Sequence, residues 1–215
     1  RHYHAGKDGR QGTNYEWVIP NYFEIADWRP KFEPGQYYAF LGRIDKCKGL
    51  DTLLEIAKHL PAGSPKIVLC GQGDPSPWAH PNIEYRGPIH GTERSEFMRN
   101  AICSLMPTNF IEPFGGSGVE GLLCGTPLIS TDYGAFTETV RHGFNGFRCK
   151  TLMDWLDALQ KVGSLDRRAI AKDARATYSL ETCGARYDDA FQKIYQLYDK
   201  GWYTLRENCG NACAA

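Results

Sequence analysis

The fold is decided by residues 37–74, which read YYAFLGRIDKCKGLDTLLEIAKHLPAGSPKIVLCGQGD. The first five residues are aromatic or apolar, which is typical of a short strand buried on both faces. Residues 50–60 carry apolar side chains at helical spacing, and residues 66–70 form a second short apolar run that ends at a glycine. A strand, a helix and a strand in this order predict a βαβ unit, whose two strands are parallel.

The same alternation continues along the chain. It predicts one doubly wound α/β domain, with a mostly parallel, Rossmann-like sheet of five or six strands flanked by helices. Further strands are expected at 83–86, 102–106, 127–130 and near Phe147, and helices at 93–101, 119–124, 135–140, 152–162, 167–178 and 180–198. An aromatic stripe from Tyr187 to Tyr198 is interpreted as core packing, part of which would be exposed in a lone domain and would mark the surface of a missing partner. Ligands bind at the carboxyl ends of the strands in such sheets, so the loops after the strands are the candidate sites.

Composition excludes several classes of protein. The 215 residues include 25 basic and 25 acidic side chains, and this balance argues against a dedicated nucleic-acid or polybasic membrane-surface protein. No apolar run approaches the ~20 residues of a membrane span. We divide the chain into a leader and linker-like segment at 1–36, the Rossmann-like domain at 37–200 and a flexible tail at 201–215. Because it begins with Arg1, we expect a processed product or an excised fragment.

Eight cysteines are scattered along the chain without a Cys-x-x-Cys pair. Several lie in or beside apolar runs, where a free cysteine behaves as a small hydrophobic residue. This pattern favours a reducing compartment, so we expect a cytoplasmic location, with peripheral membrane association possible only through a further domain. Cys209 and Cys213 are interpreted as part of an inert tail.

Two cations stand in the loop after the first strand. Arg43 follows Gly42, and Lys48 precedes Gly49, at the start of the expected helix. A guanidinium fork, an ammonium and a helix N-terminus together suit a diphosphate. The alternative interpretation is a solvated charged loop, and the loop alone does not decide between them.

The loops after the next two strands are weaker signals. Gly71 and Gly73 permit close backbone approach to a ligand, but the pattern matches neither a Walker A loop nor a dinucleotide fingerprint. Arg86, Pro88 and Ile89 belong to a loop that would suit a flat heterocycle. Taken alone, each loop is more simply an ordinary turn or surface loop.

The most informative stretch is EPFGGSGVE at residues 112–120. It offers two carboxylates, Glu112 and Glu120, and the backbone N–H groups of a glycine-rich loop. An ionised carboxylate such as that of Glu120 can accept two ribose hydroxyls, and Glu112 can face sugar hydroxyls or positive charge developing on a sugar ring. The alternative for Glu120 is simple stabilisation in the first turn of a helix, worth ~0.3–1 kcal/mol. That alternative leaves the glycines and Glu112 unexplained.

In this order of motifs the chain resembles the C-terminal, nucleotide-sugar-binding domain of the GT-B retaining glycosyltransferases of family 4. The resemblance covers roughly residues 17–200 and includes two carboxylates eight positions apart. Its marks are Val18-Ile19-Pro20-Asn21, Gly42-Arg43, Lys48-Gly49, Gly71-Gln72-Gly73, Glu112-Pro113-Phe114-Gly115, Glu120-Gly121, Cys124-Gly125-Thr126-Pro127, Gly134-Ala135-Phe136-Thr137-Glu138 and Gly143-Phe144-Asn145-Gly146. The chain departs from many relatives at Gly116-Ser117-Gly118, where they carry bulky apolar residues.

The resemblance implies a role for each matching position. Arg43 and Lys48 would hold the donor diphosphate and stabilise the leaving nucleotide, Glu120 would bind the ribose, and the loop from Arg86 to Ile89 would face the base. Glu112 and the amides of Phe114, Gly115, Gly116 and Ser117 would hold the donor sugar. No cofactor and no metal are implied, because the two cations take the place of a metal; no His, Cys and Asp cluster in the sequence has metal-ligand spacing.

The implied activity is transfer of a hexose from a UDP- or GDP-linked sugar to an unidentified acceptor, with retention of configuration, in carbohydrate biosynthesis. The N-terminal, acceptor-binding domain of such enzymes has no counterpart in the sequence, so we expect the chain alone to bind donor and to transfer poorly or not at all. Two alternatives stay open: a non-catalytic NDP-sugar-binding or interaction module, and a sugar-nucleotide epimerase of GT-B fold.

Overall fold

The computed structural model describes residues 18–33 and 35–197, and the expected leader and C-terminal tail lie outside these ranges, apart from the last part of the linker-like segment. Six strands form one parallel sheet, in the order β3-β2-β1-β4-β5-β6. The strands are β1 Tyr37–Leu41, β2 Ile67–Cys70, β3 Ile83–Tyr85, β4 Ala101–Met106, β5 Leu128–Thr131 and β6 Gly146–Cys149. This confirms the predicted doubly wound α/β fold, with β1 and β2 as the parallel neighbours that the first βαβ unit predicts.

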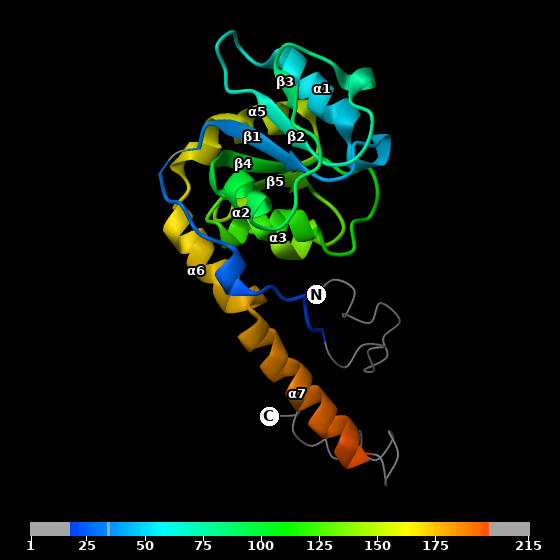
Figure 1. The fold of residues 1–215 in the computed structure, drawn as a ribbon, viewed down its shortest axis with the longest axis vertical. Coiled ribbons are helices and arrows are strands. Elements are labelled where there is room, and N and C mark those ends of the chain that lie inside the picture. Colours follow the sequence, from blue (N-terminus) through cyan, green and yellow to red (C-terminus); the bar gives the residue numbers. More distant parts are fainter. Residues whose placement is uncertain (1–17, 34, 198–215) are drawn as a thin grey trace.

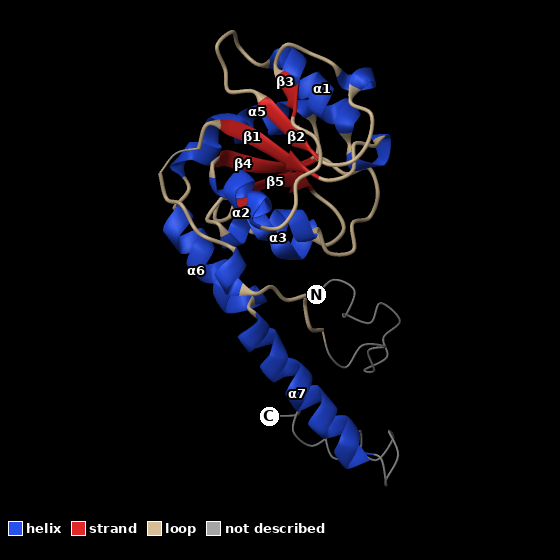
Figure 2. Cartoon of the chain, in the orientation of Figure 1, coloured by secondary structure: helices blue, strands red, loops and turns tan. Residues whose placement is uncertain are grey.

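Helices cover both faces of the sheet (Figures 1 and 2). The α-helices are α1 Leu50–His59, α2 Thr92–Arg99, α3 Gly116–Leu123, α4 Phe136–Thr139, α5 Leu152–Lys161, α6 Arg167–Tyr178 and α7 Leu180–Leu197. Short 3-10 turns occur at η1 Ile25–Asp27, η2 Lys46–Lys48, η3 Ser76–Trp78 and η4 Val162–Ser164. The apolar side chains of α1 and α5 pack on one face, and those of α2, α3 and α6 pack on the other. Every residue of β1 and β2 is buried, as their uninterrupted apolar runs predict.

Local sequence signals fix several helix ends. Thr151 and Asp154 form a reciprocal capping box at the start of α5. Asp166 accepts two backbone N–H bonds at the start of α6, and the hydroxyl of Ser179 accepts the N–H of Thr182 at the start of α7. The predicted helix at 119–124 is wrong at its start, because α3 already begins at Gly116.

The segment before β1 packs against the domain. Trp28 is buried in the core on the α2 and α3 face. Phe23 lies beside the junction of α6 and α7, where its N–H donates to the carbonyl of Tyr178 and its carbonyl accepts the N–H of Leu180. The linker-like segment therefore holds α6 and α7 in place.

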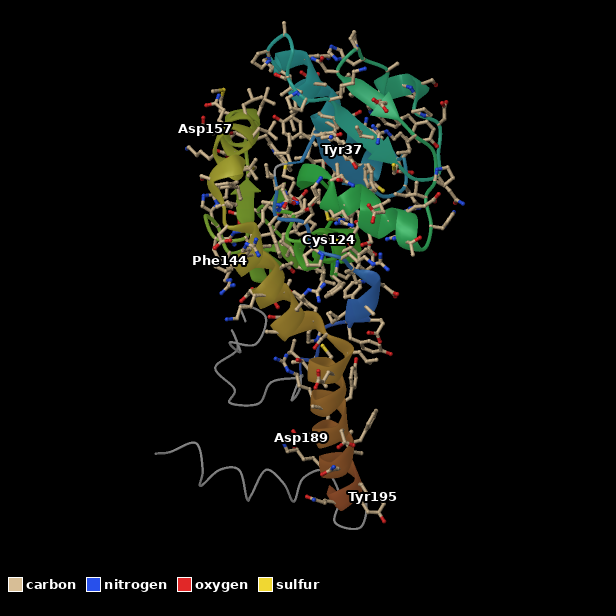
Figure 3. The ribbon with its side chains drawn as sticks, turned by 60° about the vertical axis from the view of Figure 1, so that its left-hand side comes forward. Tyr37, Cys124, Phe144, Asp157, Asp189 and Tyr195 are labelled. Atoms are coloured by element: carbon tan, nitrogen blue, oxygen red, sulfur yellow. The ribbon has the colours of Figure 1, made fainter. Side chains whose placement is uncertain are left out.

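Helix α7 projects away from the α/β body (Figure 1). Figure 3 shows Tyr195 near its far end, well separated from Tyr37 and Cys124 in the body. Part of the aromatic stripe is exposed, as expected for a domain without its partner: Phe191 is 63% exposed and Tyr195 is 83% exposed. The predicted helix is present, but the apolar face that its periodicity indicates stays exposed among the described residues.

A buried guanidinium joins the elements at the amino edge of the sheet. Nε of Arg167 donates to the carbonyl of Lys31 (2.9 Å), and Nη1 donates to the carbonyl of Ala101 at the start of β4 (2.9 Å). Nη2 donates to the carbonyl of Arg99 (3.1 Å) and to Oγ1 of Thr126 (2.9 Å). Burial lowers the pKa of Arg167, and no carboxylate among the described residues pairs with it. Carbonyl dipoles therefore take over the solvation of this charge.

We predict that Arg167→Met lowers the free energy of unfolding by at least about 3 kcal/mol, because it leaves several buried carbonyls without a donor. Urea unfolding followed by circular dichroism measures this change. The neighbouring Arg168 is exposed over the ring of Phe32, at 4.2 Å from the centroid, and is the matched control. Arg168→Ala should change stability by less than about 1 kcal/mol. Equal effects of the two substitutions would contradict the anchoring role of Arg167.

Candidate functional site

Three loops at the carboxyl edge of the sheet are tied together by backbone hydrogen bonds. The N–H of Gly42 donates to the carbonyl of Cys70 (3.0 Å), and the N–H of Gly71 donates to the carbonyl of Gly87 (3.0 Å). The N–H of Ile44 donates to the carbonyl of Gln72 at 2.7 Å. The pairing of β1, β2 and β3 thus continues past their ends into the loops that the sequence singles out.

Two of the predicted site glycines are needed for this close approach between loops. A Cβ on Gly71 would lie 1.7 Å from the carbonyl oxygen of Gly42, and a Cβ on Gly73 would lie 2.4 Å from that of Ile44. Both glycines also have positive φ, at 149° and 137°. Contacts within the chain therefore require glycine at these positions, independently of any ligand.

The structure brings Lys48 and Glu112 together, although 64 positions separate them in the sequence. Nζ of Lys48 lies 2.9 Å from Oε2 of Glu112, and the two side chains are 19% and 11% exposed. Phe110 places its ring 4.6 Å from the same ammonium. The backbone carbonyl of Glu112 accepts the N–H of Ala135, which fixes the loop from behind. A partly buried ion pair thus joins the loop after β1 to the loop after β4.

Arg43 is exposed, and within residues 18–33 and 35–197 it has no ion-pair partner. It nevertheless shares a region with Lys48, because both cations act on Asp45. Hydrogen bonds from Cys47 are the main cause of the lowered pKa of the Asp45 carboxyl, and the charges of Arg43 and Lys48 lower it further. The first loop therefore presents one neutralised cation and one that is available to an anion.

Helix α3 begins in the glycine-rich stretch. Gly115 adopts φ of 77° as its N-terminal neighbour, a conformation that glycine tolerates best, and a Cβ there would also lie 2.7 Å from the ring of Phe136. In the described part of the chain, the N–H groups of Gly116 and Ser117 have no hydrogen-bond acceptor. Free N–H groups at a helix start are suited to bind anions or hydroxyls.

Phe114 serves packing as well as the site. Its ring stacks at 6.3 Å from Phe23 and meets Tyr178 edge-on at 6.0 Å. The side chain therefore fixes the loop against the segment before β1 and the end of α6. The backbone N–H of Phe114, and not its side chain, is therefore the group available for the predicted ligand contact.

Glu120 belongs to the second turn of α3, because the helix starts three residues earlier than predicted. The prediction that Glu120 lies in the first turn was therefore wrong. Stabilisation by the first turn of the helix does not explain this carboxylate. Its side chain is 9% exposed and is held by Arg94 from α2, with Nη2 at 2.5 Å from Oε1 and 2.6 Å from Oε2. Burial raises the pKa of the Glu120 carboxyl, and the hydrogen bonds and charge of Arg94 lower it, so that a raised value remains.

Arg94 is a residue of this site that sequence reasoning missed. It is the third residue of α2 and stands among ordinary exposed polar side chains, so nothing in its local pattern distinguishes it. Only the packing of α2 against α3 brings it to Glu120.

The loop after β3 is anchored rather than open. Nε of Arg86 pairs with Oε1 of Glu84 at 2.7 Å, which raises the pKa of Arg86, and its guanidinium lies 5.0 Å from the ring centroid of Tyr37. Ile89 packs against the core, and Pro88 is exposed. No hydrogen bond or ion pair joins these three residues to Lys48, Glu112 or Glu120 in the described ranges.

No group of three or more His, Cys, Asp or Glu side chains gathers as a metal site within the described ranges. No helix there has the length and apolarity to cross a membrane. The six described cysteines are free, and burial raises the pKa of Cys70 to about 11 and that of Cys149 to about 12. Cys209 and Cys213 lie outside the described residues.

The fold is a parallel Rossmann-like α/β domain, and cations, paired carboxylates and free helix N–H groups lie at its carboxyl edge, where such sheets bind their ligands. The family of glycosyl transferases group 1 matches the chain over residues 23–176. The chain therefore belongs to this family.

Curated relatives match part of this chain. The chain is 25% identical to a glycogen synthase of Mycobacterium tuberculosis over 148 residues, which are 61% of this chain and 35% of that protein. It is 30% identical to a D-inositol 3-phosphate glycosyltransferase of Rhodococcus opacus over 156 residues, which are 64% of this chain and 35% of that protein. The chain thus spans about a third of the length of these relatives.

Solved structures share the fold. A sucrose-phosphate synthase of Thermosynechococcus elongatus superposes with a TM-score of 0.70 at 18% identity, covering 84% of this chain and 53% of that one. Alr3699/HepE of Anabaena, in complex with UDP-glucose, superposes with a TM-score of 0.68 at 18% identity, covering 82% and 57%. The architecture is therefore that of a GT-B glycosyltransferase.

We predict opposite effects for two glycine substitutions in this region. Gly71→Ala should lower the free energy of unfolding by roughly 1–3 kcal/mol, because its methyl group would meet the backbone of Gly42. Gly116→Ala, where the nearest atom is 3.9 Å away in Phe114, should be neutral or stabilise the chain by ~0.4–1 kcal/mol. Thermal and urea unfolding of both variants measure the difference. A destabilised Gly116→Ala variant would show that the helix start is not as open as the structure indicates.

Proposed function

We propose that this chain is the donor-binding domain of a retaining glycosyltransferase, which transfers a hexose from a nucleoside-diphosphate sugar to an acceptor. One observation carries the proposal: Lys48 and Glu112 neutralise each other at the sheet edge, while Arg43 and the first N–H groups of α3 are free. These free groups offer positive potential and hydrogen-bond donors, which is what a diphosphate requires.

The assignment of the remaining groups follows from their chemistry. Glu120 is an acceptor for the ribose hydroxyls, and the loop from Arg86 to Ile89 lies at the neighbouring strand end, where the base would extend. The donor sugar would lie against Glu112 and the N–H groups of Phe114 to Ser117. Gly116 offers open space for such a ligand, whereas Gly118 is closely packed, since a Cβ there would lie 2.7 Å from Leu128.

In the proposed reaction the bond between the anomeric carbon and the diphosphate oxygen breaks, and its electron pair leaves with the nucleotide. Arg43 stabilises the charge that develops on the diphosphate, Lys48 adds its charge once a donor phosphate replaces Glu112 as its partner, and Glu112 then opposes positive charge on the sugar ring. The acceptor oxygen then forms the new bond on the same face of the ring, and its proton passes to the diphosphate. Two cations and helix N–H groups supply the charge stabilisation in this scheme, so we propose metal-independent transfer.

The UDP-glucose bound by the Anabaena structure makes a UDP-linked hexose the first donor to test, beside a GDP-linked one. The acceptor stays unassigned. The chemistry proposed here belongs to the cytoplasmic synthesis of carbohydrates, where nucleotide sugars serve as donors.

We also propose that a second domain completes the enzyme. Leu180, Phe191 and Ile194 are 43%, 63% and 45% exposed on α7, and Val18 at the start of the described segment is 55% exposed. A groove of about 290 Å³ runs between the two segments and is lined by Val18, Ile19, Ala185, Arg186 and Asp189. Apolar side chains gathered at the end of a domain mark a surface that is covered in the working protein. By itself, the chain should bind donor without transferring the sugar.

We predict that Arg43→Ala weakens the binding of UDP or GDP at least about tenfold, because it removes a charge-assisted contact to the diphosphate. Isothermal titration of the 215-residue chain with UDP, GDP, UDP-glucose and GDP-mannose measures the effect. Stability should not change, since Arg43 is exposed and unpaired in the described ranges.

Arg168→Ala is the matched control, because Arg168 is an exposed arginine at the opposite edge of the sheet. It should leave nucleotide affinity unchanged. Absence of binding to all four compounds by the folded chain would overturn the proposed function. Binding that is insensitive to Arg43→Ala would remove Arg43 from the diphosphate site.

A further inference from the structure

The ion pair between Arg94 and Glu120 has a geometry that goes beyond simple charge pairing. Nη2 of Arg94 contacts both carboxylate oxygens, at 2.5 and 2.6 Å, and Nε contacts Oε2 at 3.2 Å. The two residues stand on different helices, 26 positions apart. A planar fork fixes the plane of a carboxylate in a way that a single ammonium does not.

Resting on the proposed function, we infer that Arg94 is a positioning residue for the nucleotide site. It holds the carboxylate of Glu120 ionised and in one orientation, so that its remaining lone pairs accept the ribose hydroxyls of the donor. Arg94 itself acts through Glu120 and contacts no reacting atom.

Counting acceptor sites shows that arginine and ribose can share the carboxylate. An ionised carboxylate offers about four lone-pair positions. Arg94 occupies one on Oε1 and two on Oε2, and the second of these is the long 3.2 Å contact from Nε. One hydroxyl of a ribose can use the free position on Oε1. The other can replace the weak Nε contact while Nη2 keeps its hold.

Charge explains why the carboxylate needs this partner. Glu120 is buried, and burial favours its protonated form; Arg94 is the one charged group among the described residues that opposes this. The other elements that pack against α3, the helix that carries Glu120, are β4, β5 and α6. Burial is the main cause of the raised pKa of the nearby Cys124 thiol, and the charge of Glu120 raises it further. Arg175 of α6 lowers the pKa of that thiol and donates to the carbonyl of Trp28. A protonated Glu120 would have lost acceptor capacity, so the ribose would bind less tightly.

The sign of the pH effect follows from this arrangement. Removing Arg94 removes both influences that lower the pKa of Glu120, so the carboxyl protonates at higher pH than in the unsubstituted chain. Binding of the ribose should then weaken as the pH falls through that higher value. It should recover as the pH rises above it.

The experiment is a titration of the 215-residue chain, Arg94→Met, Arg94→Lys and Glu120→Gln. The probes are UDP, GDP and their 2′,3′-dideoxy analogues, each at pH 6, 7.5 and 9. At pH 6, Arg94→Met should bind the better ribonucleotide at least about tenfold more weakly than the unsubstituted chain, and the deficit should shrink at pH 9. Its affinity for the dideoxy analogue should match that of the unsubstituted chain.

The two other variants separate charge from geometry. Arg94→Lys keeps the charge and loses the fork, so it should show a smaller deficit that does not depend on pH. Glu120→Gln should lose the preference for the ribonucleotide at every pH. If Arg94→Met does not fold, Arg94→Lys carries the test, because an unchanged ribose preference in that variant contradicts positioning by the fork.

A deficit of Arg94→Met that is equal for ribo and dideoxy nucleotides, or that is the same at all three pH values, would overturn the positioning role. If the unsubstituted chain binds nucleotides and Arg94→Met binds them equally well, only this inference fails. If the unsubstituted chain binds none of the probes, the proposed function fails and this inference fails with it.

Discussion

The fold depends on the buried guanidinium of Arg167 at the amino edge of the sheet. It donates to the linker-like segment at Lys31, to β4, to the end of α2 and to the loop before β5. The partners come from three separate parts of the chain, since the end of α2 and the start of β4 are adjacent, and carbonyl groups left at the start of a parallel sheet need donors. One side chain with five N–H donors in a planar fork satisfies most of them together, which neither lysine nor an apolar residue would do.

Because the amino edge is satisfied internally, the carboxyl edge is free to carry chemistry. There the loops after β1, β2 and β3 are joined by backbone hydrogen bonds, while the N–H groups at the start of α3 keep no partner in the described ranges. Glycines at 71 and 73 let the loops meet, and Gly115 turns the chain into α3. Stability is concentrated at one edge and unused hydrogen-bonding capacity at the other, which is the usual division in open α/β sheets.

The sequence predicted what depends on local pattern. The βαβ unit at 37–70, a sheet of five or six strands and helix α6 at 167–178 follow from apolar periodicity and were confirmed, the sheet having six strands. The start of α3 was misplaced because Gly116 and Gly118 have low helix propensity, and tertiary packing overrides it: Gly118 is pressed against Leu128 and Met106. Arg94 and Arg167 were missed because their partners are distant in sequence. How much of the stripe on α7 is exposed could not be predicted, because helical periodicity shows that a face is apolar, but not what covers it.

The charges of the candidate site are easiest to understand when the charges that pair with each other are considered first. Lys48 cancels Glu112, and Arg94 cancels Glu120, so neither carboxylate presents a net negative charge to an incoming diphosphate. Two unpaired carboxylates there would repel a diphosphate, which carries several negative charges. With both neutralised, Arg43 has only the charge of Asp45 beside it in the loop after β1, and the dipole of α3 adds positive potential for a diphosphate. The carboxylates keep the lone pairs that sugar and ribose hydroxyls require, and this separates the recognition of hydroxyls from the recognition of phosphate.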